Sequence, residues 1–136
     1  MKILLVDNDP IYLNLLGEVL TLYSHQVFKA ADGEAALAVL EKEVVHLVIS
    51  DVGMPNINGM DLHIRIREDE RLKSLPFAWN SAYPELLEVL QVEDPSIDFK
   101  FEKTMALPNL LYFVNRIDTA RRLRADADSA SERRPQ

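Results

Sequence analysis

The feature that most constrains this chain is a fivefold alternation of short apolar runs with longer stretches of helical periodicity. The apolar runs have the length and composition of buried strands and occupy Ile3–Val6, Val27–Ala30, His46–Ser50, Pro76–Asn80 and Ile97–Phe101. Apolar residues recur at helical spacing in the segments between them, which predicts helices after Pro10, over Glu34–Glu43, Met60–Arg71 and Glu85–Val92, and from Pro108 onward. Buried strands that alternate with amphipathic helices indicate a parallel sheet covered on both faces.

This pattern predicts an α/β fold of the flavodoxin-like (βα)5 type, a doubly wound sandwich with strand order 2-1-3-4-5. The 136 residues suffice for one domain, whereas a TIM barrel needs about 250. We expect the domain to cover residues 1–124. Residues 125–136 are polar, so we expect them to form a disordered tail or linker.

Composition excludes several classes of function. The chain has no cysteine, so it holds neither disulfides nor thiolate metal sites. Its longest apolar run, Ala35–Leu40, is far shorter than the roughly 20 residues of a membrane span. The net charge of −7 argues against direct binding to nucleic acid. We therefore expect a cytoplasmic protein that contacts neither membranes nor nucleic acid directly.

Polar side chains stand where four of the five strands end. These residues are Asp7 with Asn8, then Asp51, Ser81 and Lys103. Taken singly, each is explained as a turn former, a cap or a surface charge. Because the carboxyl ends of parallel strands meet at one edge of the sheet, where such folds bind ligands, the set together predicts a functional site.

The chemistry of that set favours phosphoryl transfer. Two adjacent carboxylates, Asp7 and Asp51, repel each other unless a cation neutralises them, and Mg²⁺ is the hard cation that prefers oxygen ligands. A carboxylate beside Mg²⁺ can attack a phosphoryl group and form an acyl phosphate. Lys103, the Ser81 hydroxyl and the metal would then neutralise the charge on the transferring oxygens.

At this point the sequence resembles the receiver domain of two-component response regulators, in its stand-alone, chemotaxis-regulator-like type. The resemblance covers residues 2–124 and rests on the motifs ILLVDNDP (3–10), ADGEAAL (31–37), SDVGMPNINGMDL (50–62), PFAWNSA (76–82) and FEK (101–103). It implies that a sensor histidine kinase or phosphotransfer protein donates a phosphoryl group to Asp51. It also implies Mg²⁺, or Mn²⁺, held by Asp7, Asn8, Asp51 and the backbone carbonyl of Gly53.

The resemblance further implies how the signal leaves the domain. Ser81 and Lys103 take the places of the family's switch hydroxyl and lysine, and Tyr83 stands where side chains tune dephosphorylation and partner contact. The output face would comprise the helix over residues 85–92, the strand over 97–101 and the last helix. A downstream protein, or a second copy of the chain in a homodimer, would bind there. Such a receiver is not an enzyme with a separate substrate, since it accelerates only its own phosphotransfer and dephosphorylation.

Four residues depart from the family's pattern. Asn8 replaces an acidic residue, which predicts weaker Mg²⁺ binding. Thr104 follows Lys103 where proline, often cis, is usual, so we expect a trans bond there. Lys100 stands at a position that is often aromatic, and Asn80 at one that is usually apolar. These changes leave two alternatives open: a pseudo-receiver that acts as a phosphorylation-independent interaction module, and an unrelated small phosphatase.

Other conspicuous side chains have ordinary explanations. The three histidines, His25, His46 and His63, lack metal-ligand spacing and are interpreted as ordinary polar positions. Trp79 is interpreted as a packing residue of its strand. The arginines of residues 116–124 are interpreted as a solvated helix face.

Overall fold

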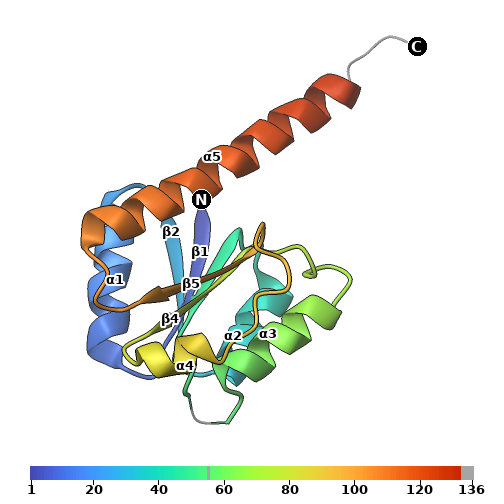
Figure 1. Cartoon of the computed structure of the whole chain (residues 1–136). Coiled ribbons are helices and arrows are strands. Elements are labelled where there is room, and N and C mark those ends of the chain that lie inside the picture. The colour runs from blue at the N-terminus through green and yellow to red at the C-terminus, as the bar shows by residue number, and fades with distance from the viewer. Residues whose placement is uncertain (55, 133–136) are drawn as a thin grey trace. The chain divides into compact units, whose positions relative to one another are not determined.

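The structure, a computed structural model, describes residues 1–54 and 56–132 (Figure 1). The strands are β1 (Lys2–Val6), β2 (Gln26–Ala30), β3 (Leu47–Ser50), β4 (Phe77–Ser81) and β5 (Asp98–Glu102). The helices are α1 (Pro10–Leu22), α2 (Gly33–Lys42), α3 (Gly59–Glu68), α4 (Pro84–Glu88) and α5 (Leu107–Glu132). The strands form one parallel sheet in the order β2-β1-β3-β4-β5, which confirms the predicted α/β topology.

The chain divides into two compact units. The first unit, Met1–Met105, contains the whole sheet with α1 to α4, and the second begins at Ala106 and contains α5. None of the helices in the described part of the chain is long and apolar enough to cross a membrane.

The pleat of the sheet divides the core of the first unit between two faces. Leu4, Val48, Phe77 and Trp79 point to the face covered by α2, α3 and α4, where they form one buried cluster with residues of those helices. Alternate residues such as Leu5 point to the opposite face, toward α1. Burial of both faces explains why the central strands are mostly apolar up to their carboxyl ends, without the alternation of a half-exposed sheet.

Side-chain caps fix where three helices begin. Asp9 accepts hydrogen bonds from the backbone N–H groups of Ile11 and Tyr12 at 3.0 and 3.4 Å, and Pro10 is the first residue of α1. The other two caps are Asp32 at α2 and Asn58 at α3. The first of these caps matters most here, because it orients α1 directly after the end of β1.

Helix α4 is shorter than the sequence pattern predicts. The predicted helix reaches Val92, whereas α4 ends at Glu88. The Lys100 Nζ, reaching over from β5, donates to the carbonyl oxygens of Leu87 and Leu90 at 2.9 and 3.1 Å. This ammonium satisfies carbonyls that a longer helix would have bonded internally, so the helix ends early.

Helix α5 is longer than predicted. It runs without a break to Glu132, so the segment from Ala125 to that residue is helical where a disordered tail was expected. The segment is rich in alanine and contains neither glycine nor proline, and these intrinsic preferences favour a helix despite its polarity. The rest of the expected tail, residues 133–136, lies outside the described residues.

Candidate functional site

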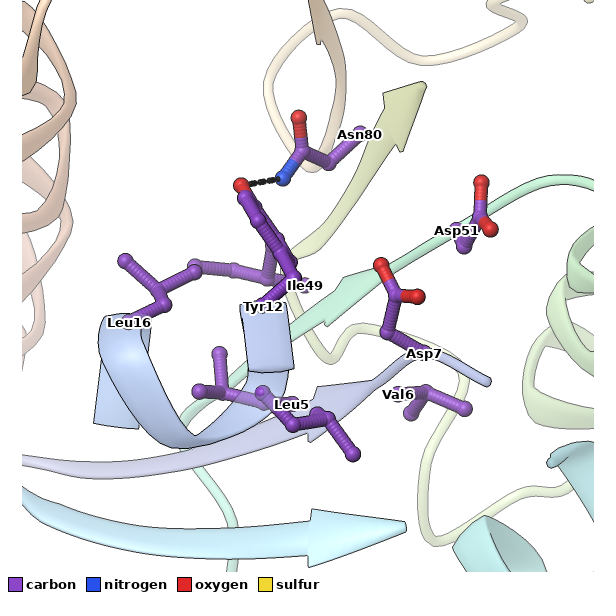
Figure 2. A pocket seen from close by; sticks show the side chains of 9 residues that line it. Leu5, Val6, Asp7, Tyr12, Leu16, Ile49, Asp51 and Asn80 are labelled. Atoms are coloured by element: carbon purple, nitrogen blue, oxygen red, sulfur yellow. Dashed lines mark hydrogen bonds between the residues drawn. The ribbon is translucent and has the colours of Figure 1, made fainter. Parts of the chain in front are cut away.

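The register of β1 and β3 brings two carboxylates side by side at the carboxyl edge of the sheet. Val6 of β1 pairs with Ser50 of β3. Asp7 follows Val6 in the chain, and Asp51 follows Ser50. The backbone N–H of Asp51 donates to the Val6 carbonyl at 2.8 Å, which ties the two strand ends together. The predicted adjacency of Asp7 and Asp51 is therefore present, and Figure 2 shows both side chains at this edge.

Lys103 places an ammonium group between these carboxylates. Its Nζ lies 2.5 Å from Asp7 Oδ2 and 3.5 Å from Asp51 Oδ2. Its backbone N–H donates to the Ser81 carbonyl at 2.8 Å, so the end of β5 is held against the end of β4. The peptide bond to Thr104 is trans, as expected, since the described residues contain no cis bond. The trans bond leaves the lysine side chain directed into the site.

Burial and neighbouring charges shift the pKa values of Asp51 and Lys103. Burial raises the pKa of Asp51 above its ordinary value of 3.8, the positive charge of Lys103 partly offsets this, and the charge of Asp7 raises it again. Burial alone would lower the pKa of Lys103, but its hydrogen bond to Asp7 and the charge of Asp51 outweigh that effect and raise it above 10.5. The lysine therefore remains an ammonium ion throughout the physiological range of pH.

The oxygen atoms of this edge suit a hard divalent cation. Asp7 Oδ1 accepts from the Asp9 N–H at 2.9 Å and Asp51 Oδ1 from the Val52 N–H at 2.8 Å, which turns both Oδ2 atoms toward one cation, the ammonium of Lys103. Asn8 and Gly53 are both exposed, and no atom lies within 4 Å of a Cβ built on the glycine. Two carboxylates, an amide oxygen and an accessible carbonyl form a donor set that fits Mg²⁺.

This donor set is weaker than a purely acidic one. Over the residues that the structure describes, no three His, Asp or Glu side chains are grouped so that they could hold a metal ion. Asn8, the third candidate ligand side chain, offers an amide oxygen without a charge. Weaker Mg²⁺ binding than at a purely acidic site stays a prediction.

Neither Ser81 nor Tyr83 is hydrogen-bonded to the carboxylates in the described part of the chain. Ser81 is fully buried, and its Oγ accepts a hydrogen bond from the Tyr83 N–H at 3.0 Å. In the described part of the chain Ser81 makes no hydrogen bond to Asp51, and the Tyr83 side chain is exposed. The structure brings together Asp7, Asp51 and Lys103, whereas the Ser81 hydroxyl is hydrogen-bonded within its own turn.

Two residues of the site carry no clear signal in the sequence. The Tyr12 ring lies beneath the Lys103 ammonium, with 4.7 Å between Nζ and the ring centroid. Asn80 Nδ2 donates a hydrogen bond to the Tyr12 hydroxyl, as Figure 2 shows. With Asp7 and Asp51 they line a cavity of about 10 Å³, which is room for about one water molecule. Asn80 stands out only as a polar residue in a buried strand, and Tyr12 only as a helical residue.

The remaining conspicuous side chains are structural. Trp79 is buried, its Nε1 donates to the Gly59 carbonyl at 3.3 Å, and its ring packs 4.4 Å from the ring of His63. His63 in turn contacts Asp98 at 2.8 Å. Both fit the packing and polar roles expected of them. Lys100 contacts the end of α4 and takes no part in the carboxylate site.

Comparison with known proteins extends this description to the level of a family. A model of the family described as response regulator receiver domain matches residues 3–115. The sensor histidine kinase RcsC of Salmonella typhimurium is 46% identical over 68 residues, which are 50% of this chain and 7% of RcsC. The response regulator protein FleR of Pseudomonas aeruginosa is 40% identical over 82 residues, which are 60% of this chain and 17% of FleR. The chain thus covers a small part of these relatives.

Solved structures of similar chains share the fold over nearly their whole length. The response regulator protein TrrA of Thermotoga maritima, solved in complex with Mg²⁺ and BeF, has a TM-score of 0.75 and 28% identity, and the match covers 85% of this chain and 97% of TrrA. The chemotaxis protein CheY4 of Vibrio cholerae has a TM-score of 0.73 and 26% identity over 85% and 97% of the two chains.

Proposed function

The chain belongs to the family of response regulator receiver domains, and on this basis we propose that it accepts a phosphoryl group on Asp51 from a sensor histidine kinase or a phosphotransfer protein. The observation that carries the proposal is the convergence of three strand ends, which places Asp51 beside Asp7 and the Lys103 ammonium. Asp51 is also the more accessible of the two carboxylates, since Asp7 is only 3% exposed.

The proposed reaction moves one phosphoryl group between a nitrogen and an oxygen. Asp51 Oδ2, which faces Lys103, attacks the phosphorus of a phosphohistidine. An O–P bond forms, the P–N bond breaks, and the imidazole nitrogen leaves with the electron pair and takes up a proton. Negative charge spreads over the three equatorial oxygens of the transferring group, so its stabilisation depends on positioned cations. Lys103 supplies one of them from within the chain.

Mg²⁺ or Mn²⁺ is the cofactor that this proposal includes. Asp7, Asp51, the Asn8 amide oxygen and the Gly53 carbonyl would hold it, and a bound divalent ion supplies positive charge against the carboxylates and the phosphoryl oxygens. The chain's own part is to orient Asp7 through the Asp9 N–H and Asp51 through the Val52 N–H.

We further propose that phosphorylation is transmitted through Ser81. Its hydroxyl is bonded to the Tyr83 N–H, and its carbonyl holds the Lys103 N–H. A phosphoryl group on Asp51 offers new acceptors to both side chains, so Ser81 would exchange its partner and release the turn before α4. The shift would alter the surface of α4 and β5 that a downstream protein reads.

A second candidate function has support from one observation. The Lys103 ammonium is closer to Asp7 than to Asp51 by about one ångström, and the Ser81 hydroxyl is bonded to the Tyr83 N–H. An arrangement fixed in this way would suit a pseudo-receiver that binds partners without phosphorylation. It differs from the first proposal in a single measurable property, the ability of Asp51 to become phosphorylated.

Intact-mass spectrometry after incubation with phosphoramidate and Mg²⁺ tests the two functions. We expect an adduct of about 80 Da, the mass of one phosphoryl group. It should disappear in Asp51→Ala and persist in the matched control Asp128→Ala, whose side chain is exposed on α5. Absence of the adduct at saturating donor concentration would reject the receiver function in favour of the pseudo-receiver.

A further inference from the structure

We infer that Tyr12, held in place by Asn80, is a positioning residue that seats the Lys103 ammonium for phosphoryl transfer at Asp51. The inference rests on the proposed function and adds to it two residues at positions with no role in the reaction described so far. Tyr12 acts through Lys103, without touching the transferred group.

The contact between Tyr12 and Lys103 has the geometry of a cation–π interaction. The Nζ lies 4.7 Å from the ring centroid, inside the limit of about 6 Å for significant attraction. Tyr12 belongs to the first turn of α1, five positions after Asp7, and the cap of Asp9 on its N–H fixes that turn. The ring therefore has a defined place on the Asp7 side of the site (Figure 2).

Asn80 restrains the ring from the other side. Its Nδ2 donates to the Tyr12 hydroxyl, and the asparagine side chain is almost fully buried at 1% exposure. Burial of an amide in a strand is costly unless it is hydrogen-bonded, so a specific partner is needed to retain it. The tyrosine hydroxyl is the partner that the structure provides for Nδ2, and the buried Oδ1 has no hydrogen-bond partner among the described residues. Asn80 would thereby hold the ring at a fixed depth below the ammonium.

The contacts of Tyr12, Asn80 and Lys103 form a closed ring that includes the ends of β4 and β5. Asn80 is bonded covalently to Ser81, whose carbonyl accepts the Lys103 N–H at 2.8 Å. The Lys103 side chain returns over the Tyr12 ring, and the Tyr12 hydroxyl returns to Asn80. The end of β4 therefore positions both the backbone and the ammonium group of Lys103. If the Tyr12 ring were displaced, only the backbone of the lysine would still be held.

The size of the effect follows from the interaction. A cation–π contact at a partly exposed site changes an equilibrium or a rate by about two- to fivefold, which corresponds to about 0.5–1 kcal/mol. Tyr12→Leu should therefore slow phosphorylation of the full chain by phosphoramidate by about two- to fivefold. Tyr12→Phe keeps the ring and loses the hydroxyl, so its phosphorylation rate should fall by less than about twofold. The phosphorylation rate of Asn80→Leu should lie between the rates of these two variants.

Nuclear magnetic resonance reports the contact between the ring and the lysine directly, and together with the rate of Tyr12→Phe it separates positioning of Lys103 from a loss of packing alone. The Lys103 ε-methylene group is bonded to the Nζ that lies over the Tyr12 ring, so we expect its proton resonances to be shifted upfield. The shift should vanish in Tyr12→Leu and persist in Tyr12→Phe. Tyr23→Leu is the matched control, because Tyr23 is exposed at the opposite end of α1 and should retain both the rate and the shift.

The outcomes separate this inference from the proposed function. If the unaltered chain takes up no phosphoryl group, the proposed function fails and the inference fails with it. If the unaltered chain is phosphorylated while Tyr12→Leu reacts at the same rate, only the inference is overturned. Tyr12→Phe reacting as slowly as Tyr12→Leu would also overturn it, since the ring itself would then not act on Lys103. Thermal melts of each variant establish that the fold is retained.

Discussion

The Lys103 ammonium lies 2.5 Å from Asp7 Oδ2 and 3.5 Å from Asp51 Oδ2, so the buried carboxylate and not the phosphoacceptor candidate is its nearer partner. The arrangement neutralises the less accessible of two neighbouring negative charges. It also leaves Asp51 as the carboxylate with an available oxygen. The lysine thus has a structural task at Asp7 in addition to its proposed task in phosphoryl transfer.

Removal of the Lys103 charge should destabilise the fold. Lys103→Met leaves the buried Asp7 carboxylate without its cation, and breaking a buried pair in this way costs about 3 kcal/mol. The free energy of unfolding from urea titration measures the loss. The double variant Lys103→Met with Asp7→Asn should recover most of it, since both charges are then absent. An equal loss in the double variant would show that packing of the lysine stem, and not the charge, stabilises this edge.

Removal of the Asp51 charge should stabilise the fold at neutral pH. Because burial raises the pKa of Asp51 above its ordinary value of 3.8, the folded state disfavours the ionised form. This cost is absent below pH 3.8, where the group is protonated in both states, and is complete once the pH exceeds the raised pKa. Asp51→Asn should therefore raise Tm at pH 7 in EDTA. The gain should narrow as the pH falls toward 3.8.

The control for this experiment is Asp128→Asn, which removes an equal charge from an exposed position of α5. A gain in Tm that stayed constant from pH 7 to pH 4 would contradict the assignment of the effect to ionisation of Asp51. Both variants are compared with the unaltered chain at the same ionic strength, because net charge alone also changes stability.

Restoration of the missing carboxylate should tighten metal binding. Asn8→Asp adds one negative charge among the proposed ligands, and a charge at contact distance from a divalent cation is worth about 1–2 kcal/mol in a solvated site. We expect Mg²⁺ affinity to rise about tenfold, measured by calorimetry or by the fluorescence of Trp79, the single tryptophan of the chain. Asn14→Asp adds the same charge on the exposed surface of α1 and should leave the affinity within about twofold.

Loss of the Lys100 ammonium should loosen the end of α4. Lys100→Met keeps an apolar stem but removes the donor to Leu87 and Leu90, at a cost of about 1 kcal/mol. Hydrogen exchange of the Leu90 amide, which bonds to the Leu87 carbonyl, should become about fivefold faster. Lys73→Met removes an exposed ammonium and should have no effect there. An unchanged exchange rate in Lys100→Met would mean that the short helix is stable without this donor.

The sheet and the pair of carboxylates were predictable because they depend on short-range patterns. Apolar runs give the strands, and the order 2-1-3-4-5 with its common register then brings the residues after Val6 and Ser50 together. Lys103 could be assigned to the same edge for the same reason. These inferences need only the direction and period of each strand, which the sequence encodes locally.

The contact between Tyr12 and Asn80 could not be predicted in this way. The two residues are 68 positions apart, and their hydrogen bond depends on the rotation of two side chains toward each other. The early end of α4 is a similar case, because it depends on hydrogen bonds from the Lys100 ammonium, which reaches the helix from β5. The length of α5 differs from the prediction for another reason. The polarity of residues 125–132 indicates a tail, whereas the helix preference of their alanines favours the observed helix.

Arg67 ties helix α3 to the amino ends of β4 and β5, at the end of the sheet opposite the carboxylates. Its guanidinium donates to the carbonyls of Leu75 and Ile97 at 2.6 and 3.3 Å and to the Asp98 carboxylate at 2.5 Å, while His63 contacts the same carboxylate. These bonds cross-link the last turns of α3 to the amino ends of β4 and β5. Since the amino ends of β4 and β5 are tied to α3 while Ser81 and Lys103 stand at the opposite ends of these strands, we expect a displacement that follows phosphorylation of Asp51 to be largest at the carboxyl ends.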